Sequence, residues 1–172
     1  GVGPGPFTGL RVGMATASAL ADALSIPLHG ICTHDAIAAA AELDVEPAAA
    51  ADEATALVAT DARRKEIYWA TYRATDSGVQ RISGPAVTKP AELEVELAST
   101  AEVIIPDRLA GQLPERFAAL PHRAAHPTAS ALVAAADLEA EPAPVVPLYL
   151  RRPDAVPPKQ QQLSAAIPKV EL

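Results

Sequence analysis

The sequence has one cysteine, few aromatic residues and no long apolar segment, and each shortage excludes a class of protein. Because Cys32 is the single cysteine, the chain cannot form an internal disulfide, and this favours a reducing compartment. Aromatic residues are 3% of the chain, so the core must rest on alanine, leucine and valine. No apolar run approaches the roughly 20 residues that span a bilayer, and nothing resembles a signal peptide. We therefore expect a soluble, cytoplasmic protein.

The charge and length also limit the function. The 172 residues carry a formal net charge of −7, which repels a phosphate backbone, so this chain alone is not expected to bind nucleic acid. The length suits one domain or two small ones. The low-complexity stretch VEPAAAADEA contains Pro47 and reads as a linker. We place the main boundary there, with one unit at 1–46, a second at 47–157 and a disordered tail at 158–172.

The opening segment GVGPGPFTG is laid out like a phosphate-binding loop. It fails the G-x-G-x-x-G pattern because Thr8 stands where the third glycine belongs. No lysine precedes Lys65, which excludes a Walker loop, and Pro4 and Pro6 remove two backbone donors. We interpret the segment as a rigid turn that positions a helix, with a direct phosphate loop as the weaker alternative.

An amphipathic helix is predicted after this turn, with Thr8 as its N-cap and Pro27 beyond its end. Its apolar stripe repeats every three or four residues: Leu10, Met14, Ala17, Ala21 and Leu24. A second stripe has almost no side-chain bulk: Gly9, Gly13, Ala17 and Ala21. Such a face lets another backbone approach closely, so we expect it to be a partner or packing interface.

The rest of the chain alternates predicted strands and helices. LHGIC (28–32) is predicted as a short buried strand, and THDAIAAAAEL as a helix capped near Thr33 or Asp35. TALVATD, EIYWATYR and GVQRIS alternate with turn residues and predict a β-meander. KPAELEVELAS is predicted as a short helix, EVIIP as a strand and PTASALVAAADLEA as a further helix.

The histidines do not form a recognisable metal site. One pair is five residues apart, and the other is four apart but flanked by prolines with no acidic residue between: His29 with His34, and His122 with His126. We interpret all four as solvated loop histidines. Cys32 has no CxxC partner and is interpreted as a core thiol. Ser18 and Ser25 have no nucleophile elbow around them, so the sequence does not support serine hydrolase chemistry.

One polar cluster remains, DARRKE at 61–66, between two predicted strands. It has two interpretations, which the sequence leaves open. The cluster can be a charged hairpin turn. Alternatively, Asp61, Arg63 and Arg64 contact an oxyanion or an acidic partner, because paired guanidinium groups bind such oxygens in a fork.

Three motifs together resemble the TsaB (YeaZ) family, the bacterial partner proteins of tRNA threonylcarbamoyladenosine biosynthesis. They are GPGPFTGLR at the start, VATDARRKEIYWATY in the middle and PLYLRRPDAV near the end, and they span residues 1 to about 157. The loop positions that match are Gly3, Gly5, Thr8, Gly9 and Arg11. Pro6 stands where serine is usual, and the family's N-terminal strands with their Asp-Thr-Ser are absent. We therefore expect a member that lacks its first third, with LHGIC exposed as an unpaired edge.

The resemblance implies an α/β fold of the actin-like ATPase (ASKHA) class with two ribonuclease-H-like lobes, the first truncated and the second complete. It implies a non-catalytic subunit that pairs with the catalytic TsaD and the ATPase TsaE in threonylcarbamoylation of adenosine 37 of tRNA, with tRNA contacted only through the complex. It also implies a homodimer as another possible assembly and no association with a membrane. This chain alone is expected to have no catalytic or metal-binding residues and to bind no cofactor. ATP or ADP is then a candidate ligand at a partner interface. A glycoprotease-like metallopeptidase and a generic nucleotide binder of the same fold stay as alternatives.

Overall fold

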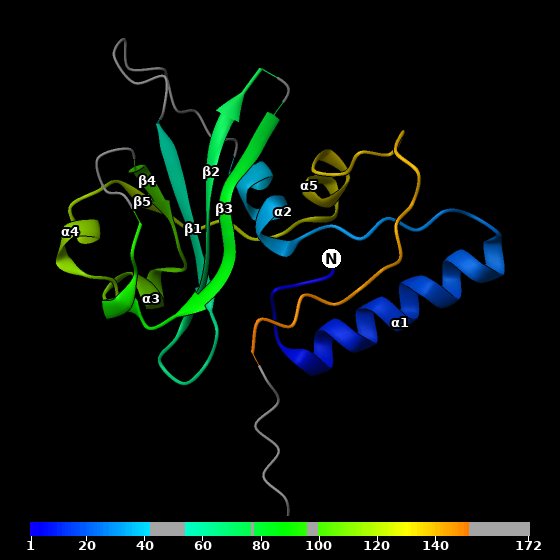
Figure 1. Cartoon of the computed structure of the whole chain (residues 1–172), viewed down its shortest axis with the longest axis horizontal. Coiled ribbons are helices and arrows are strands. Elements are labelled where there is room, and N and C mark those ends of the chain that lie inside the picture. Colours follow the sequence, from blue (N-terminus) through cyan, green and yellow to red (C-terminus); the bar gives the residue numbers. More distant parts are fainter. Residues whose placement is uncertain (42–53, 77, 96–99, 152–172) are drawn as a thin grey trace, which may run out of the picture.

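A five-stranded mixed sheet forms the centre of the computed structural model, which describes residues 1–41, 54–76, 78–95 and 100–151 (Figure 1). The strands are β1 (Thr55–Asp61), β2 (Ile67–Thr75), β3 (Gly78–Thr88), β4 (Thr100–Ile104) and β5 (His122–Arg123), in the spatial order β3-β2-β1-β4-β5. β1, β2 and β3 are antiparallel neighbours, whereas β4 runs parallel to β1 and β5 parallel to β4. The predicted β-meander and the EVIIP strand are confirmed, and β5 was not predicted.

One face of the sheet is covered by the segment that carries the 3₁₀ turn η1 (Pro90–Glu92) and the short helices α3 (Asp107–Ala110) and α4 (Glu115–Ala118). Leu93 and Phe117 from this segment are buried against Leu57 of β1 and Val103 of β4. This cluster is the aliphatic core that the composition predicted, with Phe117 as its largest buried side chain.

The opposite face is covered by α2 (Thr33–Ala40), and α5 (Ala129–Ala134) packs on α2 (Figure 1). Ile37 and Ala38 of α2 are buried with Val58, Ala70 and Tyr72 of the sheet. The small alanine side chains let the helix approach the strands closely, which offsets the scarcity of large apolar residues.

The long helix α1 (Phe7–Leu24) lies beside the sheet layer rather than on it (Figure 1). Ala21 is the one buried residue among its 18. The helix ends at Leu24, where Ser25 adopts the left-handed conformation and its N–H bonds to the Asp22 carbonyl. The predicted helix is confirmed, but its predicted cap is wrong. The helix begins at Phe7 after Pro6, so Thr8 already lies inside its first turn and no side chain caps it.

A C-terminal strap, which we define as residues 145–151, connects α1 to the rest of the fold. The Leu148 N–H donates to the Val2 carbonyl at 2.8 Å. The Arg11 Nε donates to the Tyr149 hydroxyl at 2.8 Å, and the Phe7 ring meets the Tyr149 ring edge-on at 5.1 Å. In Figure 1 the strap runs between α1 and the sheet.

The structure corrects the prediction of a strand at LHGIC. This stretch is extended but is not part of the sheet. It pairs with the N-terminal segment through two backbone hydrogen bonds. They run from the Val2 N–H to the Ile31 carbonyl at 2.8 Å and from the Thr33 N–H to the Gly3 carbonyl at 2.7 Å. Two such bonds are too few for a regular ladder.

Three predicted helix details also differ from the structure. KPAELEVELAS forms only η1 in its described part, because Leu93 and Val95 are spaced for an extended chain whose side chains face the core. The predicted last helix stops at Ala134. Beyond it, the Asp137 carboxylate accepts hydrogen bonds from the N–H groups of Glu139 and Ala140, and such local bonds compete with the backbone bonds of a helix. Cys32, not a polar side chain, precedes α2. The predicted tail at 158–172 lies outside the described residues, and so does the predicted linker at 45–54, except for its last residue, Ala54.

Gly84 of β3 is a position where an added methyl group has no room. Its φ is +85°, and a Cβ would lie 2.7 Å from the Trp69 carbonyl oxygen and 2.9 Å from the Ala70 Cα. Gly78, with φ +128°, has nothing within 4 Å of such a Cβ. We expect Gly84→Ala to lower the free energy of unfolding by about 2–4 kcal/mol, from backbone strain plus overpacking, and Gly78→Ala by about 1–2 kcal/mol. Urea denaturation measures both, and equal losses would contradict the packing argument.

Candidate functional site

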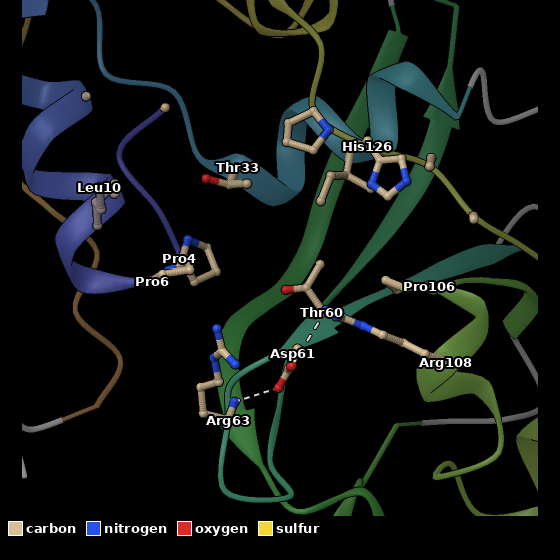
Figure 2. A pocket seen from close by; sticks show the side chains of 18 of the residues that line it. Pro4, Pro6, Leu10, Thr33, Thr60, Asp61, Arg63, Pro106, Arg108 and His126 are labelled. Carbon is tan, nitrogen blue, oxygen red and sulfur yellow. Dashed lines mark hydrogen bonds and ion pairs between the residues drawn. The ribbon is translucent and has the colours of Figure 1, made fainter. Parts of the chain in front are cut away.

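A cavity of about 840 Å³ lies at the carboxyl ends of the parallel strands (Figure 2). Three parts of its wall lie at or just after the ends of β1, β4 and β5. They are Thr60, Asp61 and Arg63, then Pro106, Asp107 and Arg108, then Ala124, Ala125, His126 and Pro127. The carboxyl ends of parallel strands meet at one edge of a sheet, which is the usual ligand position in α/β proteins. The cavity also has the size of small-molecule sites.

The facing wall comes from the N-terminal segment and from the two larger helices. Gly9, Leu10 and Gly13 of α1 line it, together with Thr33 and Ile37 of α2. A Cβ on Gly9 or Gly13 would meet nothing within 4 Å. The small-residue stripe predicted from the sequence therefore borders open space at these two glycines and is buried only at its far end, Ala21.

Asp61 connects the charged groups of this wall. Its Oδ1 accepts the Arg63 backbone N–H at 2.7 Å, and its Oδ2 lies 3.6 Å from the Nη2 of Arg108. Figure 2 shows the Arg63 side chain extending from the hairpin toward Pro6, ahead of α1. The sequence identified Asp61 and Arg63 but missed Arg108. The sequence feature that could have identified Arg108 is its position just after the EVIIP strand. That strand runs parallel to β1, which ends at Asp61.

The loop between β1 and β2 is a charged hairpin with an unusual backbone. Arg63, Arg64 and Lys65 have φ values of +65°, +53° and +61°, a left-handed run that costs roughly 1–2 kcal/mol per residue. Two backbone bonds close the loop, from the Glu66 N–H to the Arg63 carbonyl at 2.9 Å and from the Ala62 N–H to the Glu66 carbonyl at 3.0 Å. The hairpin interpretation of this cluster is confirmed. The oxyanion interpretation is compatible with the same geometry.

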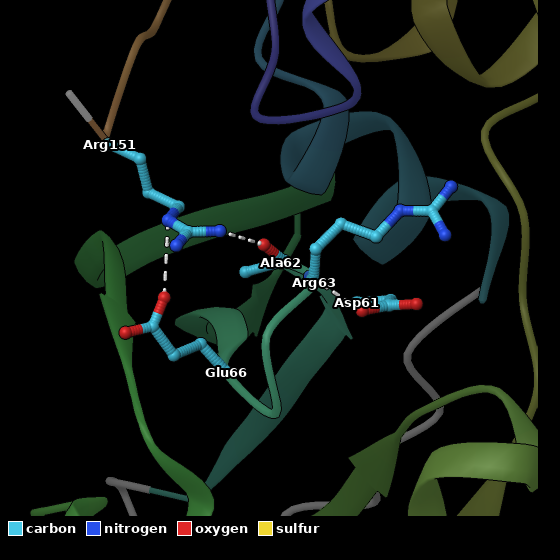
Figure 3. Close-up of polar contacts among 5 residues, drawn as sticks. All are labelled: Asp61, Ala62, Arg63, Glu66 and Arg151. Atoms are coloured by element: carbon cyan, nitrogen blue, oxygen red, sulfur yellow. Dashed lines mark hydrogen bonds and ion pairs between the residues drawn. The ribbon is translucent and has the colours of Figure 1, made fainter. Parts of the chain in front are cut away.

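Arg151 of the strap fixes this hairpin from outside (Figure 3). Its Nη1 donates to the Ala62 carbonyl at 2.8 Å, and its Nε lies 3.2 Å from the Glu66 Oε2. The Arg151 side chain is 16% exposed, so this ion pair is shielded from solvent far more than a typical surface pair. The contact joins the third sequence motif to the second.

A second cavity, of about 280 Å³, lies where all three motifs meet. Its walls are Gly5, Pro6, Phe7 and Thr8 from the first motif, Asp61, Ala62, Arg63, Arg64 and Tyr68 from the second, and Arg151 from the third. Gly5, Pro6, Asp61 and Arg63 also line the larger cavity, so the two adjoin. The sequence placed the motifs in order along the chain but gave no sign that they converge.

His34 corrects the prediction of a solvated histidine. It is fully buried, and its Nε2 lies 2.8 Å from the Thr60 Oγ1, which ties α2 to the end of β1. Burial, followed by the charge of Arg81, lowers the pKa of His34 to about 3. The missed signal is helical spacing, since residue 34 shares a face with Ile37, Ala38 and Ala41, which are buried.

Next to His34, Asp35 joins α2 to β2 and β3. The Tyr72 hydroxyl donates to the Asp35 Oδ1 at 2.8 Å, and the Nη1 of Arg81 lies 3.3 Å from the same oxygen. Burial raises the pKa of Tyr72 far above its usual range, and the Asp35 charge raises it further. Cys32 is buried as predicted for a core thiol, and burial raises its pKa too.

The other predicted residues are spread over the molecule. His29 is half-buried, and His122 and His126 are exposed. Across the described ranges, no three or more histidine, cysteine or carboxylate side chains are grouped so that they could hold a metal ion. None of the described helices is long and apolar enough to cross a membrane.

A family model described as "TsaD: tRNA N6-adenosine threonylcarbamoyltransferase" matches residues 1–136. The chain belongs to this family, in its TsaB/YeaZ branch. An uncharacterized protein of Mycobacterium leprae is 48% identical over 161 residues, which cover 91% of this chain and 38% of the relative. An uncharacterized protein of Mycobacterium tuberculosis is 44% identical over 160 residues, 91% of this chain and 64% of the relative. This member thus spans less than two thirds of these relatives' length.

Named proteins of the branch match as well. The tRNA threonylcarbamoyladenosine biosynthesis protein TsaB of Escherichia coli is 38% identical over 80 residues, 46% of this chain and 32% of TsaB. YeaZ from Pseudomonas aeruginosa superposes with a TM-score of 0.68 at 24% identity, covering 87% of this chain and 72% of YeaZ. A second structure, described as similar to peptidase YEAZ from the same organism, gives the same TM-score and covers 88% and 71%. The likeness confirms the predicted actin-like fold class.

The buried His34 makes stability depend on pH. Between pH 6.5 and about 3, His34 is protonated in the unfolded state but neutral in the folded state. Proton binding therefore favours the unfolded state, and the free energy of unfolding falls as the pH falls. From pH 7 to pH 5 this group should remove about 2 kcal/mol. We expect His34→Gln to flatten that dependence, although it lowers stability at pH 7, and the exposed control His126→Gln to leave it unchanged. Denaturation at both pH values tests this, and an unchanged slope in His34→Gln would refute it.

Proposed function

We propose that the protein acts in the biosynthesis of tRNA threonylcarbamoyladenosine as a non-catalytic partner subunit in the cytoplasm. The supporting observation is the family match over residues 1–136, together with the similarity to a TsaB protein whose name states this pathway. In this proposal the chain pairs with a TsaD-like catalytic paralogue, and a TsaE-like ATPase joins the pair. Contact with tRNA then runs through the complex, in line with the acidic charge of this chain.

Two features of the site support a non-catalytic role. A general base works best with a pKa near the operating pH, and the pKa of His34, at about 3, is far below it. The Asp61 carboxylate is engaged by the Arg63 N–H and by Arg108. Both side chains are thus engaged in contacts that hold the structure together.

The surface of α1 supports the partner role. Val12, Leu20 and Leu24 of this helix are 62%, 57% and 64% exposed, and Ile26 just beyond it is 54% exposed. Apolar side chains grouped on one exposed helix are typical of an interaction site. We propose that this helix, with its stripe Gly9, Gly13, Ala17 and Ala21, docks on the partner or on a second copy of the chain.

The division into a first unit at 1–46 and a second at 47–157 is part of the same proposal. Its boundary lies outside the described residues. The separate position of α1 supports two units, whereas the packing of α2 on the sheet means that the two share a core. A docking helix carried on the first unit is held by the strap, through the hydrogen bond from Arg11 to Tyr149.

Co-purification tests the proposed function. The full-length protein is co-expressed with the TsaD-like paralogue of the same organism, and only one of them carries an affinity tag. We expect both to elute together, and depletion of this protein to lower threonylcarbamoyladenosine in tRNA digests measured by mass spectrometry. An untagged paralogue that stays in the flow-through, with normal levels of the modified nucleoside, would contradict the proposal.

Gly13 provides a sharper test of the helix surface. Leucine at this position has free space in the isolated chain, and the helix gains about 1 kcal/mol of propensity. We therefore expect Gly13→Leu to weaken association at least tenfold without lowering the melting temperature. Ala15→Leu, an exposed small residue two positions on, is the matched control and should change neither. A sharp fall in melting temperature with normal association would mean that the stripe is packed inside the fold.

The metallopeptidase alternative has weaker support. A solved relative is described as similar to peptidase YEAZ. No metal-binding group of three or more side chains occurs in the part of the chain that the structure describes. Metal analysis of the purified protein distinguishes the alternatives, since stoichiometric zinc or iron with chelator-sensitive peptide cleavage would favour the peptidase.

A further inference from the structure

The strap at residues 145–151 joins two parts of the protein that share few other contacts. Its last residue, Arg151, holds the hairpin between β1 and β2, whereas Leu148 and Tyr149 hold the segment that leads into α1 and the start of α1 itself (Figures 1 and 3). No other helix or strand in the described ranges packs extensively on α1. Besides the chain that leads from α1 into α2, the strap is therefore the link between this helix and the sheet.

The contacts at the α1 end of the strap lie within the first turns of the helix. The Arg11 Nε donates to the Tyr149 hydroxyl at 2.8 Å, and the Arg11 guanidinium carbon lies 5.4 Å from the centre of the Tyr149 ring. A Cβ on Gly3 would lie 3.2 Å from both the Leu10 Cδ2 and the Leu148 carbonyl oxygen, so helix and strap pack closely around this glycine.

The apolar side chains that α1 exposes lie beyond these first-turn contacts. Val12, Leu20 and Leu24 are more than half exposed, and Ala21 is the one buried residue of the helix. The strap thus holds α1 near one end and leaves the proposed docking surface open. Because the helix extends away from this attachment, the attachment determines where the docking surface lies relative to the sheet (Figure 1).

The other end of the strap is attached to the sheet through a shielded contact. The Arg151 side chain is 16% exposed, its Nη1 donates to the Ala62 carbonyl, and its Nε forms an ion pair with Glu66 (Figure 3). Ala62 directly follows β1, and Glu66 directly precedes β2. The position of the strap is therefore set by two central strands of the sheet.

A helix that is fixed before binding associates more tightly than one that must be ordered during binding. Association has to offset the loss of freedom of every element that it immobilises. A helix of 18 residues gains most of its stability in a protein from packing, and α1 has little packing of its own. A contact that fixes α1 therefore raises the affinity of its surface without touching the partner.

We propose that Arg151 is a positioning residue for docking: by fixing the strap to the hairpin, it holds α1 in the orientation in which the exposed face of the helix binds the partner. The hydrogen bond and the ion pair of Arg151 are both made with the hairpin. Its effect on docking is thus transmitted through Tyr149 to α1. This inference rests on the proposed function of α1 as a docking helix.

Hydrogen exchange of the complete chain without a partner gives the first test. In Arg151→Ala we expect the backbone amides of α1 to exchange about tenfold faster, while those of β1 and β4 keep their protection. Lys65→Ala is the matched control. It removes one positive charge from the same hairpin at an exposed position outside the strap contact, and it should leave the exchange of α1 unchanged.

Titration against the TsaD-like paralogue gives the second test. We expect Arg151→Ala to weaken association about tenfold and Lys65→Ala less than twofold. Arg151→Lys should recover part of the loss, since an ammonium group keeps the charge beside Glu66 but lacks the planar fork that reaches the Ala62 carbonyl as well. Tyr149→Ala breaks the strap at its other end and should weaken association to a similar extent.

Three results would overturn this inference while the parent chain still binds the paralogue. Unchanged affinity in Arg151→Ala would mean that docking does not need a fixed helix. Faster exchange across β1 and β4 as well would mean that Arg151 only stabilises the fold. An equal loss of affinity in Lys65→Ala would mean that the charge of the hairpin acts on the partner directly. A parent chain that does not bind the paralogue contradicts the proposed function itself, and this inference with it.

Discussion

The ion pair between Arg151 and Glu66 anchors the end of the strap that holds α1. No other helix or strand in the described ranges packs extensively on α1, and the helix is held by Tyr149 and by the neighbouring backbone bond from Leu148 to Val2. Arg151 anchors that same strap to the hairpin between β1 and β2. A shielded ion pair with an added hydrogen bond to a carbonyl is suited to this task, because its geometry is specific even where its net energy is small.

The two cavities follow from this arrangement. One wall is the carboxyl edge of β1, β4 and β5, which the sheet fixes. The facing wall is the segment that leads into α1, which the strap fixes. The bond between His34 and Thr60 fixes α2, the third side of the larger cavity. Thr60 and Arg151 thus each fix one wall and also line one of the two cavities.

The sequence predicted the local structure well and its assembly poorly. The meander was readable because alternation and turn residues act over a few positions, as in TALVATD and EIYWATYR. The stretch LHGIC was misread because an apolar run becomes a strand only where a neighbour offers a full ladder of bonds. The burial of His34 was readable from its helical spacing, whereas its partners Thr60 and Arg81 were not, because they are distant in sequence.

The candidate site shows the same limit. Asp61, Arg63 and Arg64 were identified because a charged cluster between two strands is visible in one dimension. Their neighbour Arg108 lies 47 residues beyond Asp61 in the sequence, and the parallel pairing of β1 with β4 brings it within reach. Convergence of the three motifs depends on the strap, whose path is set by single contacts such as Tyr149 with Arg11.

The outer strand β3 has a consequence for how the protein behaves at high concentration. It is 11 residues long and lies at the margin of the sheet, where unpaired backbone groups could recruit the strand of another molecule. Pro85 lacks a donor, Arg81 adds a charge, and the pairing with β2 shifts register near Thr71. These irregularities interrupt the flat template that fibrillar stacking requires, so the chain can keep a long sheet margin and still resist self-association through it.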